Sequence, residues 1–235
     1  MVIACIAFSS SAQKKTGTVG LLRIHFINTV NGIPLILGDS ISYLNPFSEV
    51  YSVQKFRYYV SNVAVNDQQE AESYHLVDAS KPGSLQFEFP VKAGSYSSFS
   101  FLLGVDSLHN CSGAQTGALD PMNDMFWTWN SGYVILKLEG SAPVSSQVNH
   151  RIEYHLGGYA GINKVMRLIS LQREFKIIAG GKTEIYIQAD VNAIWQNPND
   201  IKIAAVNICT TAGELAKKIA NNCSHLFTIK NVVLP

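Results

Sequence analysis

Charge is scarce in this sequence, and neither sign dominates. Only 15% of the 235 residues are charged, whereas roughly 25% are charged in an average soluble protein. The 18 lysines and arginines nearly match the 17 aspartates and glutamates, so the formal net charge is +1. Nucleic-acid binders need a basic surface to displace counterions, and polybasic membrane binders need clustered lysines and arginines. The composition therefore argues against both classes.

Long hydrophobic runs are also missing. No stretch approaches the roughly 18 consecutive apolar residues that a membrane-spanning helix needs. Val2 to Phe8 is apolar, and it is followed by Ser10-Ser11-Ala12, which resembles the tail of a secretory signal peptide without its basic start. We expect residues 1–12 to be a signal-peptide remnant and residues 13–235 to form one exported domain, periplasmic or extracellular. A lipoprotein signal ending at Cys5 and an N-terminal core strand are the alternatives.

Cysteine is sparse, with four in the chain and no CxxC pair. The absence of CxxC argues against a zinc site made of thiolates. Export permits oxidation, and Cys209 and Cys223 flank a short segment. A disulfide between them closes a loop of about 15 residues and contributes roughly 3 kcal/mol in the chain-entropy model. We expect that bridge, with Cys111 as a small buried side chain.

The motifs of common enzymes are absent. The chain has no GxSxG, no P-loop and no GxGxxG that opens a helix. The sequence GGKT at 180–183 indicates a hairpin turn, because the earlier glycine and the following helix of a phosphate loop are missing. We therefore expect no enzyme. HxH, HxxxH and HExxH are missing too, so any metal site must be assembled from separate strands.

Short runs of alternating polar and apolar residues fill the chain. In the first run, Leu22, Ile24 and Phe26 share one face of an expected strand, and Arg23 and His25 share the other. Similar runs follow at 56–60, 85–89, 99–103, 133–138, 151–155, 165–171, 183–191 and 226–234. Alternation of this kind predicts roughly nine or ten strands. The expected fold is all-β, an antiparallel β-sandwich of immunoglobulin-like or jelly-roll-like type.

One short helix is expected near the C-terminus. Thr211 and Glu214 have the spacing of a capping box, which predicts a helix start. Leu215 and Ile219 then repeat at helical spacing, and the helix is expected to end near Asn222.

The stretch from Gly104 to Ser131 is long and irregular for a compact domain. Loops of that size are usually functional or unstructured, and its aromatic content argues against an unstructured one. It contains GVDS at 104–107 and most of GALDPMNDMFWTWNSGY at 117–133. RYYVSN precedes it at 57–62, and KLEG at 137–140 and YHLGG at 154–158 follow it. Together these motifs resemble the MbnP-like family, over about Leu22 to Val233.

The family occurs in methanobactin gene clusters and more widely among exported bacterial proteins. The resemblance implies a secreted β-sandwich protein that binds copper. In such proteins a tryptophan can be oxidised to kynurenine and serve as a copper ligand with histidines. A partner di-haem peroxidase-like protein performs that oxidation. Asp124 departs from the family, which more often has glycine there, and the four-cysteine pattern of a proteobacterial branch is absent.

Three histidines are candidate copper ligands. His155 comes first, because it lies in the family-like YHLGG element and an imidazole nitrogen suits copper. His75 and His25 are candidates for the second position. Trp127 and Trp129 are two residues apart, so they share one face of an expected strand. One of them is expected to be modified or to line the pocket, and the alternative is a core aromatic cluster.

Three carboxylates of the same stretch suggest calcium as an alternative metal. Asp106, Asp120 and Asp124 supply the oxygen ligands that a hard cation prefers, although their spacing does not match an EF-hand. Asp120 precedes Pro121, an order that is also typical of a turn.

The sequence thus favours a non-enzymatic, exported protein that sequesters or delivers a metal, most simply copper. A secreted recognition module is the alternative, and it binds a glycan or a partner protein through Trp127, Trp129 and Tyr133. A hydrolase with an unrecognised site is the third possibility.

Overall fold

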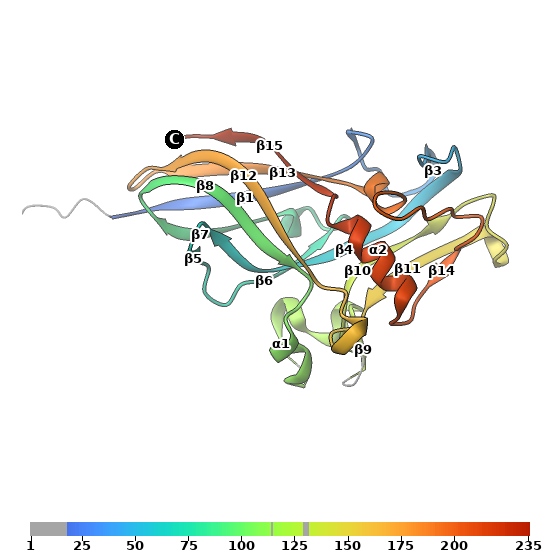
Figure 1. The fold of residues 1–235 in the computed structure, drawn as a ribbon. Coiled ribbons are helices and arrows are strands. Elements are labelled where there is room, and N and C mark those ends of the chain that lie inside the picture. The colour runs from blue at the N-terminus through green and yellow to red at the C-terminus, as the bar shows by residue number, and fades with distance from the viewer. Residues whose placement is uncertain (1–17, 114, 129–131) are drawn as a thin grey trace, which may run out of the picture.

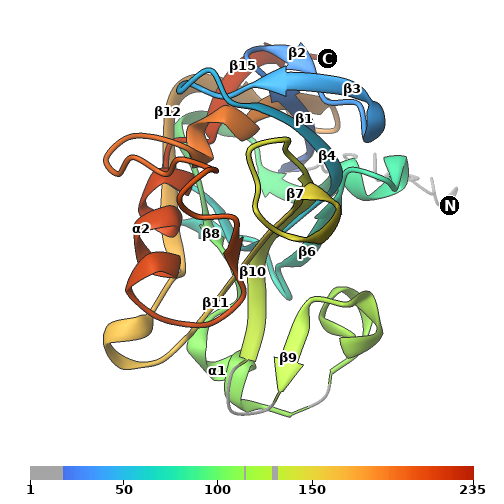
Figure 2. The ribbon, with the colours of Figure 1, turned by 90° about the vertical axis from the view of Figure 1, so that its right-hand side faces the viewer.

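The structure is a computed structural model that describes residues 18–113, 115–128 and 132–235. Within these residues the strands form a five-stranded sheet and a ten-stranded sheet, which we call the small sheet and the large sheet. Figure 1 shows β15, β13 and β1 of the small sheet at the upper left and the large sheet reaching across to β11 and β14 at the right. Helix α1 and strand β9 project below both sheets, in Figure 1 and again in the rotated view of Figure 2.

The small sheet comprises β15 (Phe227–Val233), β13 (Lys182–Asp190), β1 (Val19–Val30), β2 (Ile33–Pro34) and β7 (Gln86–Lys92). The main path of the large sheet comprises β12 (Arg167–Ile177), β8 (Gly94–Leu103), β4 (Val50–Val65), β10 (Gly132–Ser141), β11 (Arg151–Gly157) and β14 (Ile208–Cys209). Strands that pair with β4 or β10 off this path are β3 (Gly38–Leu44), β5 (Gln68–Gln69), β6 (Tyr74–Asp78) and β9 (Phe126–Thr128).

The helices are α1 (Ser107–Cys111) and α2 (Glu214–Cys223) in the described residues. Short 3-10 turns are η1 (Pro82–Leu85), η2 (Gly117–Leu119), η3 (Pro121–Asn123), η4 (Val148–His150), η5 (Gly161–Asn163) and η6 (Val191–Ile194). No helix of the described part of the chain has the length and apolar character needed to cross a bilayer.

The two sheets pack face to face around aromatic side chains, as the alternating pattern predicts. Leu22 and Ile24 of β1 are fully buried, while Arg23 and His25 of the same strand are only half-buried. Phe26 of the small sheet meets Tyr58 and Phe101 of the large sheet edge-on, at centroid distances of 5.8 and 6.1 Å. Such aromatic pairs add to the stabilisation that area burial provides. A sandwich-like β fold is therefore confirmed.

The sheets are mixed rather than purely antiparallel, which corrects the prediction. β1 and β13 pair in parallel from Leu21 opposite Lys182 to Thr29 opposite Asp190. β11 and β14 also pair in parallel. Alternation along a strand reports which residues share a face but carries no information on the direction of its neighbour. The expected direction of pairing was therefore wrong at these two places.

The C-terminal helix is present, but its capping box is not formed. Helix α2 begins at Glu214 with Gly213 at the N-cap, and no side chain caps it. Gly213 has a φ of +153°, a conformation that favours glycine. Ile219 lies on the buried face and Cys223 ends the helix, close to the predicted position. The predicted cap at Thr211 was therefore wrong by two residues.

The predicted disulfide is not formed. Cys209 in β14 and Cys223 at the end of α2 are both buried and free. Burial raises the pKa of the Cys209 thiol to about 11, and it raises the pKa of the Cys223 thiol as well. Closeness in sequence does not bring the two thiols together. Cys209 lies in β14, which pairs with β11, whereas Cys223 ends α2 in the core. Cys111 is exposed, contrary to the expectation that it is buried.

Trp195 should be the most costly tryptophan to remove. Its side chain is fully buried, and Tyr51 and Tyr154 meet it edge-on at 5.2 and 5.3 Å. We expect Trp195→Ala to lower the free energy of unfolding by about 3–5 kcal/mol, measured by urea denaturation. Trp195→Phe should cost less, because it keeps part of the aromatic contact. Equal stability of wild type and Trp195→Ala would contradict this packing.

Candidate functional site

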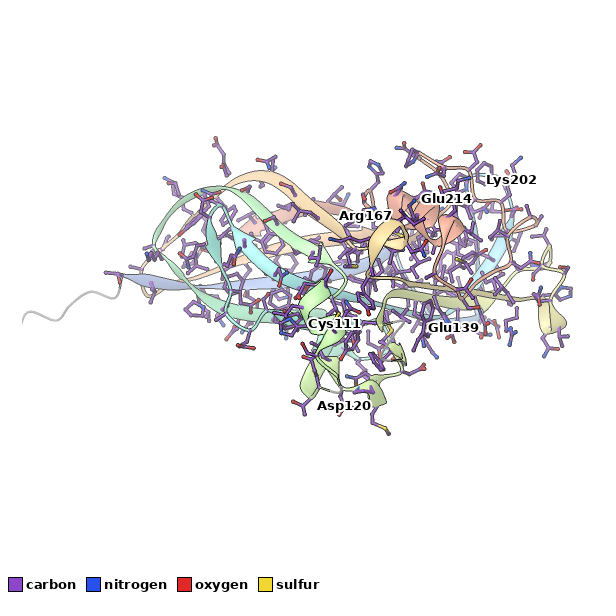
Figure 3. The ribbon with its side chains drawn as sticks, turned by 60° about the horizontal axis from the view of Figure 1, so that its bottom comes forward. Cys111, Asp120, Glu139, Arg167, Lys202 and Glu214 are labelled. Carbon is purple, nitrogen blue, oxygen red and sulfur yellow. The ribbon has the colours of Figure 1, made fainter. Side chains whose placement is uncertain are left out.

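The irregular stretch folds into a cap on the outer face of the large sheet. Its elements are α1, η2, η3 and β9. Residues of η2, of β9 and of the segment between η3 and β9 join a second hydrophobic cluster, separate from the core between the sheets. The cluster joins Leu119 and Met125 of the cap to Tyr59 of β4 and Tyr133 of β10. Figure 3 shows Asp120 in the lower part of this cap and Cys111 nearer the sheets. The described part of the cap is thus packed on the large sheet.

A row of polar side chains crosses the large sheet beside the cap. Asp78, Arg57, Lys137 and His155 lie directly opposite one another on β6, β4, β10 and β11. The neighbouring row, Val77, Tyr58, Leu136 and Leu156, belongs to the core between the sheets. Since successive residues of a strand face opposite sides, the polar row lies on the outer face.

Asp124 fastens the cap to this row. Its carboxylate lies 2.9 Å from Nζ of Lys137 and 3.4 Å from Nζ of Lys55, and Lys137 also donates to its backbone carbonyl. Burial raises the pKa of this carboxyl, but the two lysines outweigh that effect, so the pKa lies below its usual value. Asp124 has a φ of +58°, the left-handed region that favours glycine. Its carboxylate supplies ion pairs that a glycine at this position cannot make.

His155 is held by a carboxylate on the neighbouring strand. Its Nε2 lies 2.9 Å from Oε1 of Glu139, and Oε2 of Glu139 lies 3.0 Å from Nζ of Lys55. The hydrogen bond from His155 is the main reason that the pKa of Glu139 falls to about 2, and Lys55 adds to it. With Nε2 engaged, Nδ1 is the ring nitrogen left for a ligand.

Trp127 lies against the same strand as His155. A Cβ atom at Gly157 would come within 2.4 Å of Cζ3 of Trp127, so glycine is what admits the indole ring there. Residues 155 and 157 share a face, about 7 Å apart along the strand. Trp127 is half-buried and also lines a pocket of 410 Å³ with Tyr159 and Asn163. Trp129 falls outside the described residues, as do residues 1–12.

His25 and His75 lie on other faces of the two sheets. His75 is opposite Val60, which belongs to the core between the sheets, and its ring stacks on Phe87 of the small sheet at 3.6 Å. Its Nε2 lies 2.8 Å from Glu70. His25 is on the outer face of the small sheet, stacked on Tyr186 at 4.4 Å. The expected combination of His155 with either of them is not formed, because the sheets separate the three rings.

The three aspartates of the cap do not converge either. Asp106 caps α1, Asp120 caps η3 by accepting from the backbone N–H of Met122, and Asp124 pairs with lysines. The turn interpretation of Asp120 is therefore confirmed. In the described part of the chain, no three His, Cys, Asp or Glu side chains are arranged to hold a metal ion.

The sequence reasoning missed the residues that organise this region. Glu139 and Lys137 look like ordinary surface charges in KLEG, and only the pairing of β10 with β11 reveals their contacts with His155 and Asp124. His109 is not among the histidines that the sequence singles out, yet it contacts Asp106 and Tyr74. The sequence does carry one indication of this contact. Asp106 is an aspartate of the kind that occupies helix N-cap positions, and His109 follows it by three residues.

The fold and the site define a two-sheet β protein whose outer face is covered by a fastened cap next to a histidine and a tryptophan. The MbnP family model matches residues 19–211, so the chain belongs to the MbnP family. MbnP from Methylosinus trichosporium has a similar fold, with a TM-score of 0.56 and 12% identity over 84% of this chain and 83% of that one. No curated protein matches the chain. The predicted family is confirmed.

The contacts of Glu139 should make the free energy of unfolding depend on pH. The unfolded carboxyl titrates near its ordinary value of 4.5 and the folded one near 2, so its contribution is complete above pH 4.5 and is lost as the pH falls toward 2. We expect the stability difference between wild type and Glu139→Gln to shrink by about 1 kcal/mol from about pH 5 to about pH 3. Urea denaturation at both pH values measures it.

His155→Ala provides the matched comparison, because it removes the main cause of the lowered pKa while leaving Glu139 in place. It should flatten the same part of the pH profile. A difference between wild type and Glu139→Gln that is constant with pH would contradict the assignment.

Proposed function

We propose that this protein is an exported, non-enzymatic member of its family that binds copper as cargo and sequesters or delivers it. The observation that carries the proposal is that one face of β11 carries His155 and, two residues on at Gly157, receives the indole ring of Trp127 from β9. Glu139 holds one nitrogen of His155 and so orients the other, an arrangement typical of metal-ligating histidines.

The donor set supports a site centred on His155 rather than a cage of three histidines. His25 and His75 are engaged with glutamates on other faces of the two sheets and do not enter it. Oxidation of Trp127 to kynurenine by a di-haem peroxidase-like partner would add a carbonyl and an amine beside His155. Trp127 is half-buried at the edge of a pocket, which is compatible with access from outside. Calcium is less well supported, because lysines occupy the carboxylate of Asp124.

A recognition module is the second candidate. The pocket of 410 Å³ is lined by the aromatic rings of Trp127 and Tyr159 and by the polar side chains of Asn163, Thr210 and Thr211. Aromatic rings beside hydrogen-bonding groups suit a sugar or a peptide.

Copper titration separates the two candidates. We expect wild type to bind one Cu(I) per chain and His155→Ala to bind at least tenfold more weakly, since a metal ligand is lost. His225→Ala is the matched control, because His225 is exposed outside this region, and it should bind as wild type does. Competition with a chromogenic Cu(I) chelator measures both affinities.

The protein should be isolated from its native host for this titration, because a recombinant chain made without its partner can lack the modification. Intact mass then reports kynurenine as the replacement of one carbon by one oxygen. Equal copper affinity of wild type and His155→Ala would exclude the site. Absence of copper binding in the native protein would favour the recognition module.

A further inference from the structure

A second histidine site lies in the cap, apart from His155. Nδ1 of His109 lies 2.6 Å from the Tyr74 hydroxyl and 3.0 Å from Oδ2 of Asp106, and Tyr74 also donates to Oδ2 of Asp106. The rings of Tyr74 and His109 pack together at a centroid distance of 4.3 Å. Asp106 is fixed in turn, because its other oxygen accepts the backbone N–H of His109 at the start of α1.

This network determines which ring nitrogen of His109 carries the proton. The Tyr74 proton is donated to Asp106, so Nδ1 of His109 is the donor toward the tyrosine oxygen and the carboxylate. The lone pair of the neutral ring is then on Nε2. A carboxylate that orients a histidine through one nitrogen while the other is available is the arrangement found behind metal ligands.

His109 lines a pocket of 500 Å³ that also offers oxygen acceptors. Glu72 and Gln115 lie in the same lining, with Thr116. The amide nitrogen of Gln115 donates to the carbonyl of His109 at 2.7 Å, which leaves its amide oxygen as an acceptor. Among the described residues that line it, none is lysine or arginine. Glu72, with Asp106 behind His109, gives the pocket a negative charge that suits a cation.

We propose that this pocket binds a divalent transition-metal ion, with Nε2 of His109 and the carboxylate of Glu72 as ligands and the amide oxygen of Gln115 as a third. One nitrogen and two oxygens are a set that Zn²⁺ accepts, with water completing its coordination. Only two of these three groups are titratable, so the pocket is consistent with the absence of a three-residue cluster of His, Cys, Asp or Glu in the described residues.

The site is independent of the copper proposal. His155 belongs to β11 and is paired with Glu139, whereas His109 belongs to α1 and is paired with Asp106 and Tyr74. The two share no ligand, so loss of one leaves the other intact.

Isothermal titration with Zn²⁺ alone, on the full chain, tests the proposal. We expect one zinc per chain in wild type, at least tenfold weaker binding in His109→Ala, and unchanged binding in the His225→Ala control. Glu72→Gln should weaken binding as well. Asp106→Asn keeps an N-cap residue but loses the charged acceptor behind His109, so we expect about a tenfold loss of affinity.

Two further measurements keep the outcome decisive. Zinc should shift the ring resonances of His109 in the NMR spectrum of wild type, which avoids any effect of substitution on folding. His155→Ala should bind zinc as wild type does, whatever its copper affinity. Absence of zinc binding by wild type, equal affinity in His109→Ala, or ring shifts confined to other histidines would each overturn the proposal.

Discussion

Side chains along a strand point alternately to the two faces of a sheet, and that constraint decides which residues of this protein can meet. On β11 it sends Tyr154 and Leu156 into the core between the sheets and leaves His155 on the outer face with Gly157. On β6 the pairing of His75 with Val60 sends that imidazole to the inner side, against Phe87. Two histidines that look equivalent in the sequence are thus separated by the thickness of a sheet.

The same outer face carries the cap, which two kinds of interaction hold in place. Its apolar side packs in a second cluster around Tyr59 and Tyr133, away from the main core. Its charged side is fastened through Asp124 to Lys137, whose side chain is almost fully buried beneath it. A buried ammonium is costly unless it is paired and hydrogen-bonded. Lys137 therefore specifies the position of the cap as well as stabilising it.

Each histidine that we single out is oriented by a carboxylate. Glu139 on the neighbouring strand binds His155, and Asp106 at the N-cap position of α1 binds His109 of the same helix. The first pair depends on strand register, and the second depends on local helix geometry. An arrangement that leaves one ring nitrogen available appears on two unrelated elements.

Much of the fold followed from the sequence. The alternating runs identified the long strands and their buried faces, and the helical spacing of Leu215 and Ile219 identified α2. The motifs around the cap identified the family. These features are local, because they depend on the residue types within one turn or one strand.

Pairing across the chain was decided only by the tertiary structure. The parallel alignment of β1 with β13, the free state of Cys209 and Cys223, and the separation of His25, His75 and His155 all depend on which strands become neighbours and in which direction. The sequence determined which side of each strand is buried. Only the folded sheets determined which outward side chains lie together, because that depends on the register between strands that are far apart in the chain.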